Sequence, residues 1–267
     1  MGELIFIGMG LHSEADISLK GLKKAKEADA VFAELYTSLM PGLSKEKLRE
    51  ATGKGIHLVT RRDLEEEEGR KILDASKKGK AVLLVPGDPL IATTHVDLRI
   101  RAEKQGVKTS IIHGASIVSA AIGLSGLQNY KFGRSVTIPF IDVGVVSETP
   151  YNVIAENKNR GLHTLCFLDI KTDEKRYMTA NQGLKTLLEL ENRKHQNVVV
   201  SDSLAVGIAR AGSENPVVKA DFAHGLLEFD FGQPPHSLIF PGKLHFMEAE
   251  ALVTLAKAPV TVKAMVT

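Results

Sequence analysis

The chain has 267 residues, which suits one large domain or two small ones with a substantial core. Apolar residues make up 43% and charged residues 25%, and a net charge of +2 is too small to indicate nucleic acid as a main partner. A single cysteine, Cys166, excludes an intrachain disulfide framework, and no apolar stretch approaches the eighteen residues that would span a membrane. The apolar run at the N-terminus is too short for a signal peptide, so a cytoplasmic location is the expectation.

Short apolar runs alternate with amphipathic segments through the first half of the chain. Most of these runs are apolar at consecutive positions, as is typical of strands that are covered on both faces. They predict strands at Leu4–Gly8, Ala30–Glu34, Ile56–Thr60, Ala81–Gly87 and Lys108–Gly114. The alternation with helical patterns predicts a mostly parallel sheet with helices on both faces.

Two polar segments in this half indicate where helices begin. Thr94 is followed three residues later by Asp97, a spacing that resembles a capping box and predicts a helix start. The acidic run at 63–70 is interpreted as a solvated loop or the start of a helix.

The pattern changes after Arg134, where we expect a domain boundary that divides the chain into 1–134 and 135–267. Strands are predicted at 135–140 and 163–170, and helices at 152–159, 179–194 and 246–256. Apolar segments at 197–202, 205–213, 216–230 and 236–242 predict a run of strands, partly antiparallel. The second domain is therefore expected to be α/β with a mixed sheet.

Several kinds of catalytic site are not indicated by the sequence. The nine histidines show no metal-ligand spacing, so no metal site is predicted. The chain has neither a P-loop nor a G-x-S-x-G elbow. Cys166 lies within an apolar strand and is expected to be buried and inert.

Three loops rich in small residues follow predicted strands of the first domain. They are Gly8-Met9-Gly10, Pro86-Gly87-Asp88-Pro89 and His113-Gly114-Ala115-Ser116. In a parallel sheet such loops meet at the carboxyl edge, where ligands bind. Each could also be only a tight turn between a strand and a helix, and a Rossmann site fails on spacing because Ser13 stands where the third glycine belongs.

Asp88 decides which ligand suits this edge. A phosphate requires N–H donors and cations, and a carboxylate would repel it. A ligand with a ribose, an amino acid end and a positive centre fits better. The loops therefore favour S-adenosylmethionine, whose sulfonium needs no basic residue.

Longer motifs resemble a known family. The segments FIGMGL, PGDPLIATTH, HGASIVSAAIG, GLHTLCFLDIK, YMTAN, ARAGS and DFGQPPHSLIFPGKLHFMEAEAL are similar to the diphthine synthases, which belong to the tetrapyrrole methylase superfamily. The resemblance covers nearly the whole chain. It implies two α/β domains, S-adenosylmethionine bound in the cleft between them, and a homodimer.

The resemblance also implies which residues contact the cofactor, often through backbone atoms. These cofactor-binding residues are Leu11, Asp88, Ile91, Ser116, Ile117, Leu168, Ala211 and His236. No catalytic side chain is implied.

The implied reaction is threefold N-methylation of the amino group on a 3-amino-3-carboxypropyl-histidine of translation elongation factor 2. This reaction forms diphthine in diphthamide biosynthesis, with S-adenosylhomocysteine as the product of the cofactor. Neither nucleic acid nor a membrane is expected as a partner. The alternatives are a tetrapyrrole methyltransferase, although Leu11-His12-Ser13 departs from the G-x-G-P-G-D loop usual there, and a nucleotide-binding protein without enzymatic activity.

Overall fold

The computed structural model describes residues 2–141, 144 and 146–266, which form two compact units. Unit 1 contains the residues up to 117 together with 172–174, and unit 2 contains 118–171 and the residues from 175 onward. The boundary near Arg134 that the sequence favours stays a prediction. The two units are described separately below.

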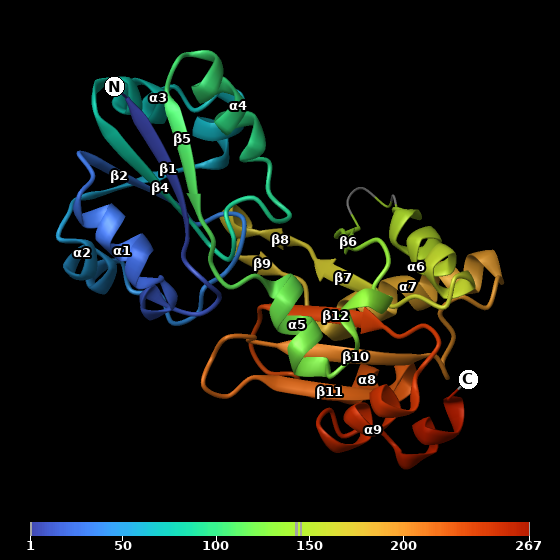
Figure 1. Ribbon diagram of the computed structural model, residues 1–267. Helices are drawn as coiled ribbons and strands as arrows, with labels where there is room; N and C mark the ends of the chain where they lie inside the picture. Colours follow the sequence, from blue (N-terminus) through green and yellow to red (C-terminus); the bar gives the residue numbers. More distant parts are fainter. Residues whose placement is uncertain (1, 142–143, 145, 267) are drawn as a thin grey trace. The chain divides into compact units, whose positions relative to one another are not determined.

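Unit 1 is built on five parallel strands in the order β3-β2-β4-β1-β5 (Figure 1). The strands are β1 (Glu3–Gly8), β2 (Ala30–Glu34), β3 (Ile56–Val59), β4 (Lys80–Val85) and β5 (Lys108–Ile112). Each lies where an apolar run predicts it. The parallel sheet of the first domain is therefore confirmed.

Helices cover both faces of this sheet, because successive side chains of each strand point to opposite sides. On one face Ile5 and Ile7 pack in the cluster that contains residues of α1 (Leu19–Lys26) and α2 (Lys45–Thr52). On the other face Leu4 and Phe6 pack with residues of α3 (Arg70–Lys78) and α4 (Val96–Lys104). Strands covered on both faces account for the continuous apolar runs.

The capping box expected at Thr94 is wrong. Helix α4 begins at Val96, its N-cap is His95, and no side chain caps it. The hydroxyl of Thr94 instead donates to Oε1 of Glu65 at 3.3 Å. Glu65 belongs to the π-helical turn Arg62–Glu66, which overlaps the acidic run. A long-range partner thus replaces the local cap that the spacing suggests.

Unit 2 contains a mixed sheet in the order β11-β10-β12-β7-β6, in which only β6 and β7 are parallel (Figure 1). The strands are β6 (Val136–Ile138), β7 (Thr164–Leu168), β10 (Leu204–Ala209), β11 (Val217–Phe222) and β12 (His236–Phe240). Short strands β8 (Ile170–Lys171) and β9 (Arg176–Tyr177) form a separate hairpin. The mixed sheet predicted for the second domain is confirmed.

The helices of unit 2 are α5 (Ile117–Ser125), whose first residue belongs to unit 1, α6 (Thr149–Asn159), α7 (Ala180–Lys194), α8 (Ala223–Glu228) and α9 (Phe246–Thr254). The main core packs residues of α6, α7 and α8 against the strands. Cys166 lies in this core, and burial raises the pKa of its thiol, as expected of an inert cysteine.

One expected strand in unit 2 is wrong, and another is confirmed only in its first half. No strand forms at 197–202, because the backbone N–H groups of Asn197, Val198 and Val199 donate to the carboxylate of Glu191 at 2.7 to 3.0 Å. The segment 216–230 is half strand and half helix, since β11 ends at Phe222 and α8 follows directly.

Within the described residues, every helix is too short or too polar to cross a bilayer.

Candidate functional site

The three small-residue loops of unit 1 meet at a junction of glycines. A Cβ added to Gly8 would lie 2.5 Å from both Gly87 O and Gly114 N, and one added to Gly114 would lie 2.4 Å from Gly87 O. Gly10 and Gly87 also exchange backbone hydrogen bonds of 3.3 and 2.6 Å. Only glycine allows backbones to approach this closely. The common edge predicted from the sequence is therefore present in unit 1.

The first loop contains its own anion. One oxygen of Asp16, Oδ2, accepts from the backbone N–H groups of Leu11 (3.2 Å), His12 (2.6 Å) and Ser13 (3.2 Å). Convergent N–H groups of this kind are what a phosphate-binding loop offers to its ligand. Here a side chain of the protein already occupies them, which agrees with the argument against phosphate.

Asp88 is buried and has two partners within its own unit. Its Oδ1 accepts from Leu90 N at 3.1 Å, and its Oδ2 lies 2.6 Å from Nδ1 of His113. The side chain of His113 is 74% exposed, so the pair connects the buried carboxylate with the surface of the edge. A carboxylate has about four acceptor positions, and two partners leave capacity for a ligand hydroxyl.

The other predicted contact residues of unit 1 lie beside this junction. Ile91 is 45% exposed although it is apolar, and its loop is fastened by a hydrogen bond of 2.8 Å from the hydroxyl of Thr93 to Pro89 O. Leu11, Ser116 and Ile117 are half-buried. All five predicted residues of unit 1 thus follow the carboxyl ends of β1, β4 and β5.

The three predicted residues of unit 2 also share one sheet edge. Leu168 ends β7, His236 begins the antiparallel β12, and Ala211 follows the end of β10. The register brings them together, because Ser237 pairs with Phe167 and His236 pairs with Ala209. All three are buried.

Both ring nitrogens of His236 are engaged inside unit 2. Nδ1 accepts from Ala180 N, the first residue of α7, at 3.1 Å, and Nε2 donates to Gln233 O at 3.1 Å. Burial lowers the pKa of this histidine, which keeps the ring neutral. A ligand contact at His236 would therefore use its backbone or ring face rather than a free ring nitrogen.

Arg210 was not singled out by the sequence, although it holds this edge together. Its backbone N–H donates to Pro235 O at 2.8 Å, and its guanidinium donates to Phe231 O at 2.8 Å and Gln233 O at 2.6 Å. These bonds fix the turn before His236. In the sequence Arg210 is marked only by its position within the ARAGS motif, where an arginine looks like an ordinary charged residue.

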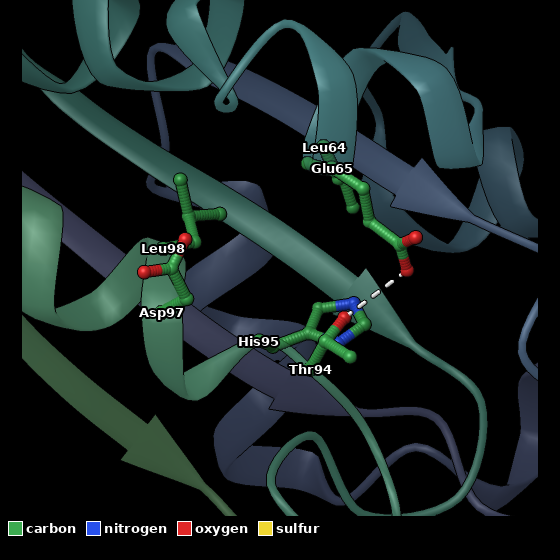
Figure 2. Close-up of a pocket in the computed structure, with 6 residues that line it drawn as sticks. All are labelled: Leu64, Glu65, Thr94, His95, Asp97 and Leu98. Atoms are coloured by element: carbon green, nitrogen blue, oxygen red, sulfur yellow. Dashed lines mark hydrogen bonds between the residues drawn. The ribbon is translucent and has the colours of Figure 1, made fainter.

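A second polar cluster lies where the end of β2, the segment after β3 and the loop after β4 meet, and no motif of the sequence indicated it. A cavity of about 260 Å³ is lined by Leu64, Glu65, Thr94, His95, Asp97 and Leu98 (Figure 2). The side chain of His95 is 1% exposed, and Nε2 lies 3.6 Å from Oε1 of the fully buried Glu34. Burial lowers the pKa of His95 to about 4 and raises that of Glu34.

The described residues contain no group of three or more His, Cys, Asp or Glu side chains that could hold a metal ion.

The fold and these loop ends match a known class of protein. The family model described as tetrapyrrole (corrin/porphyrin) methylases matches residues 3–215 of the chain. This class is thus defined over both sheets, from β1 to the segment after β10.

Individual relatives narrow the class. The chain is 54% identical over 261 residues to the diphthine synthase of Methanosarcina acetivorans, covering 96% of this chain and 97% of that protein. It is 50% identical to the diphthine synthase of Methanocaldococcus jannaschii, covering 95% and 99%. A crystal structure of diphthine synthase superimposes with a TM-score of 0.90 at 43% identity, covering 99% of this chain and all of that one. The chain therefore belongs to the diphthine synthases of the tetrapyrrole methylase family, and it is a methyltransferase.

These findings confirm the family resemblance seen in the motifs and favour diphthamide biosynthesis over tetrapyrrole methylation. They do not test the eight cofactor-binding residues one by one, so that assignment stays a prediction.

Proposed function

We propose that the protein transfers methyl groups from S-adenosylmethionine to the amino group of a 3-amino-3-carboxypropyl-histidine on translation elongation factor 2. Three transfers would give the trimethylated amine of diphthine. The similarity to diphthine synthases supports the reaction, and membership of the tetrapyrrole methylase family supports methyl transfer.

The observation that carries the choice of cofactor is the glycine junction of unit 1. None of its three loop sequences, 8–18, 86–95 and 113–120, contains lysine or arginine, whereas Glu14, Asp16 and Asp88 supply three carboxylates. Asp16 satisfies the N–H groups that would otherwise attract an anion. An edge of this charge suits the ribose hydroxyls and the sulfonium of S-adenosylmethionine.

The proposed cofactor-binding residues are those of the sequence prediction. Leu11, Asp88, Ile91, Ser116 and Ile117 belong to unit 1, and Leu168, Ala211 and His236 belong to unit 2. Asp88 would accept from a ribose hydroxyl, and the exposed side chain of Ile91 would cover an apolar part of the ligand. S-adenosylmethionine supplies the electrophilic methyl group when it is bound.

The chemistry asks little of an acid or base. The lone pair of the amine attacks the methyl carbon in line, the carbon–sulfur bond breaks, and sulfur keeps the electron pair as S-adenosylhomocysteine leaves. An α-amino group has a pKa of about 8, so roughly a tenth is neutral at pH 7. Alignment of the two reactants can supply several kcal/mol of barrier reduction. No side chain is therefore proposed as an essential general base.

The deciding experiment uses radiolabelled S-adenosylmethionine with aminocarboxypropyl-modified elongation factor 2. Label on the elongation factor supports the proposal, and label on a porphyrinogen but not on the factor contradicts it.

We further propose that the protein acts as a homodimer in the cytoplasm. Light scattering during size-exclusion chromatography should give twice the chain mass of 28.9 kDa.

A further inference from the structure

Two buried side chains of unit 1 have polar atoms without partners. Among the described residues, the two ring nitrogens of His95 have no hydrogen-bond partner, and the hydroxyl of Tyr36 has none either. Both side chains are buried, Tyr36 with 8% of its surface exposed. Buried polar atoms are almost always paired, since leaving them unpaired costs stability. Such a pair of orphans indicates a place where a ligand completes the hydrogen bonding.

Glu34 holds a fixed position beside these orphans. It is the last residue of β2, and its Oε2 accepts from the backbone N–H groups of Tyr36 at 3.0 Å and Thr37 at 3.1 Å. Its Oε1 accepts from the hydroxyl of Thr37 and also faces Nε2 of His95 at 3.6 Å, slightly beyond hydrogen-bond distance. A small approach of the ring would make Nε2 the donor to Glu34 and leave Nδ1 as a free acceptor.

The cluster is next to the proposed methyl-donor site. Strand β4 lies between β2 and β1 in the sheet, and neighbouring strands are about 4.8 Å apart. The loop that follows β4 contains both Asp88 and, seven residues later, His95. His95 also lines the cavity drawn in Figure 2. One edge of the sheet therefore carries a donor half at the ends of β1, β4 and β5. It also carries a polar, partly hollow half, in which His95 from the loop after β4 lies beside Glu34 at the end of β2.

We propose that His95 and Tyr36 bind the acceptor amine, with Glu34 as the residue that positions His95. This inference rests on the proposed function, because it takes the aminocarboxypropyl group as the substrate. The guanidinium of Arg61 lies 5.4 Å from the centre of the Tyr36 ring and supplies a cation for the carboxylate of that group. The amine and the carboxylate of that group are attached to the same carbon atom, so an acceptor and a cation close together match them.

The chemistry of the acceptor predicts a distinctive pattern over the three transfers. A neutral imidazole has a lone pair that accepts an N–H of the neutral amine, which turns the lone pair of the amine toward the methyl carbon. The primary and the monomethylated amine both have an N–H for this purpose. The neutral dimethylated amine has none. After each of the first two transfers the new ammonium releases its proton to solvent before the next attack.

The test uses the full-length protein with aminocarboxypropyl-modified elongation factor 2 and follows species with zero to three methyl groups by mass spectrometry. His95→Phe fills the same space without an acceptor, and we expect at least tenfold slower first and second transfers with the third changed less than threefold. Tyr36→Phe should slow the first transfer at least threefold. His95→Gln, which restores an acceptor, should recover part of the rate.

Two further measurements separate this role from a structural one. Affinity for S-adenosylmethionine, measured by calorimetry, should stay within twofold in His95→Phe. The melting temperature should stay equal or rise, since an unpaired buried polar group is removed. The exposed His57 on β3 serves as the matched control, and His57→Phe should leave all three transfers unchanged.

Wild-type rates in His95→Phe, equal slowing of all three transfers, or a parallel loss of cofactor affinity would each overturn the inference. Absence of transfer by the wild-type protein would instead overturn the proposed function, so the two failures are distinguishable.

Discussion

The buried carboxylate of Glu248 offers a quantitative prediction about unit 2. It lies on α9 with no exposed surface and accepts four hydrogen bonds. The donors are Gln128 N (2.9 Å), His245 N (2.9 Å), His163 Nε2 (2.9 Å) and Lys131 Nζ (2.5 Å). We predict that Glu248→Gln, which removes the charge without changing the shape, strongly destabilises the protein.

The magnitude follows from the pKa. Burial alone would raise the pKa of Glu248, but the four hydrogen bonds outweigh burial and hold it at about 2, below the ordinary 4.5. The gap between these two pKa values corresponds to roughly 3 kcal/mol at neutral pH. Breaking a buried ion pair costs about 3–5 kcal/mol, which agrees. The melting temperature should fall by roughly 6–12 °C.

The sign gives a pH dependence. Because the folded pKa is lowered, the stabilisation is complete above pH 4.5 and is lost as the pH falls toward 2. The difference in unfolding free energy between wild type and Glu248→Gln should therefore shrink at pH 3 to less than about half of its value at pH 7. Guanidinium unfolding followed by circular dichroism at pH 7 and pH 3 measures it. Glu250→Gln, on the same helix but half-exposed and paired with Lys263, is the control and should have little effect.

Equal losses in Glu248→Gln and Glu250→Gln, or a gap that is the same at both pH values, would refute this reasoning.

Three predictions concern the glycine junction. Gly114→Ala should weaken S-adenosylmethionine binding at least tenfold in calorimetry, because its Cβ would lie 2.4 Å from Gly87 O; Gly123→Ala, with open space around it, should not. Asp88→Ala should weaken S-adenosylmethionine binding about tenfold, or 1.4 kcal/mol. Asp88→Asn should weaken it less, because the amide oxygen can still accept a hydrogen bond and the shape of the loop is kept. Unchanged affinity in Asp88→Ala would remove the carboxylate from the site. Asp16→Ala should lower both cofactor affinity and the melting temperature, because three N–H groups lose their acceptor; an unaltered melting temperature would contradict this.

The elements that the sequence predicted correctly are those with a local cause. The strands of unit 1 are continuous apolar runs, since each is buried on both faces. Helix α7 begins at a true capping box, in which Thr179 accepts from Gln182 N and the side chain of Gln182 accepts from Thr179 N. The small-residue loops follow from strand direction alone, because parallel strands bring their carboxyl ends to one edge.

The errors have distant causes. The spacing of Thr94 and Asp97 is that of a cap, yet the Thr94 hydroxyl binds Glu65, twenty-nine residues away in the chain. The apolar run at 197–202 would suit a strand, but N–H groups of this run donate to the carboxylate of Glu191 instead of to a neighbouring strand. Side-chain partners of this kind compete with regular structure and leave no periodic trace in the sequence.

The same limit applies to the second half of the carboxyl edge of unit 1. Glu34 and His95 are 61 positions apart, and each looks ordinary in the sequence, one at the end of a strand and one before a helix. Only the order β3-β2-β4 brings the end of β2 beside the loop after β4. His95 is buried beside Glu34 with no hydrogen-bond partner for its ring among the described residues, and no spacing rule could reveal this.

Asp16 and Asp88 together explain why loops shaped like a phosphate cradle contain carboxylates. In a phosphate-binding loop the ligand is the anion that converging N–H groups require. Here Asp16 is that anion, so these N–H groups of the loop after β1 have their acceptor within the chain. Asp88 then adds a second carboxylate beside Leu90 and His113 without any nearby loop lysine or arginine. An edge whose donors are already satisfied and whose free capacity is that of an acceptor favours hydroxyls and a positive centre over phosphate, and this preference is present before any cofactor arrives.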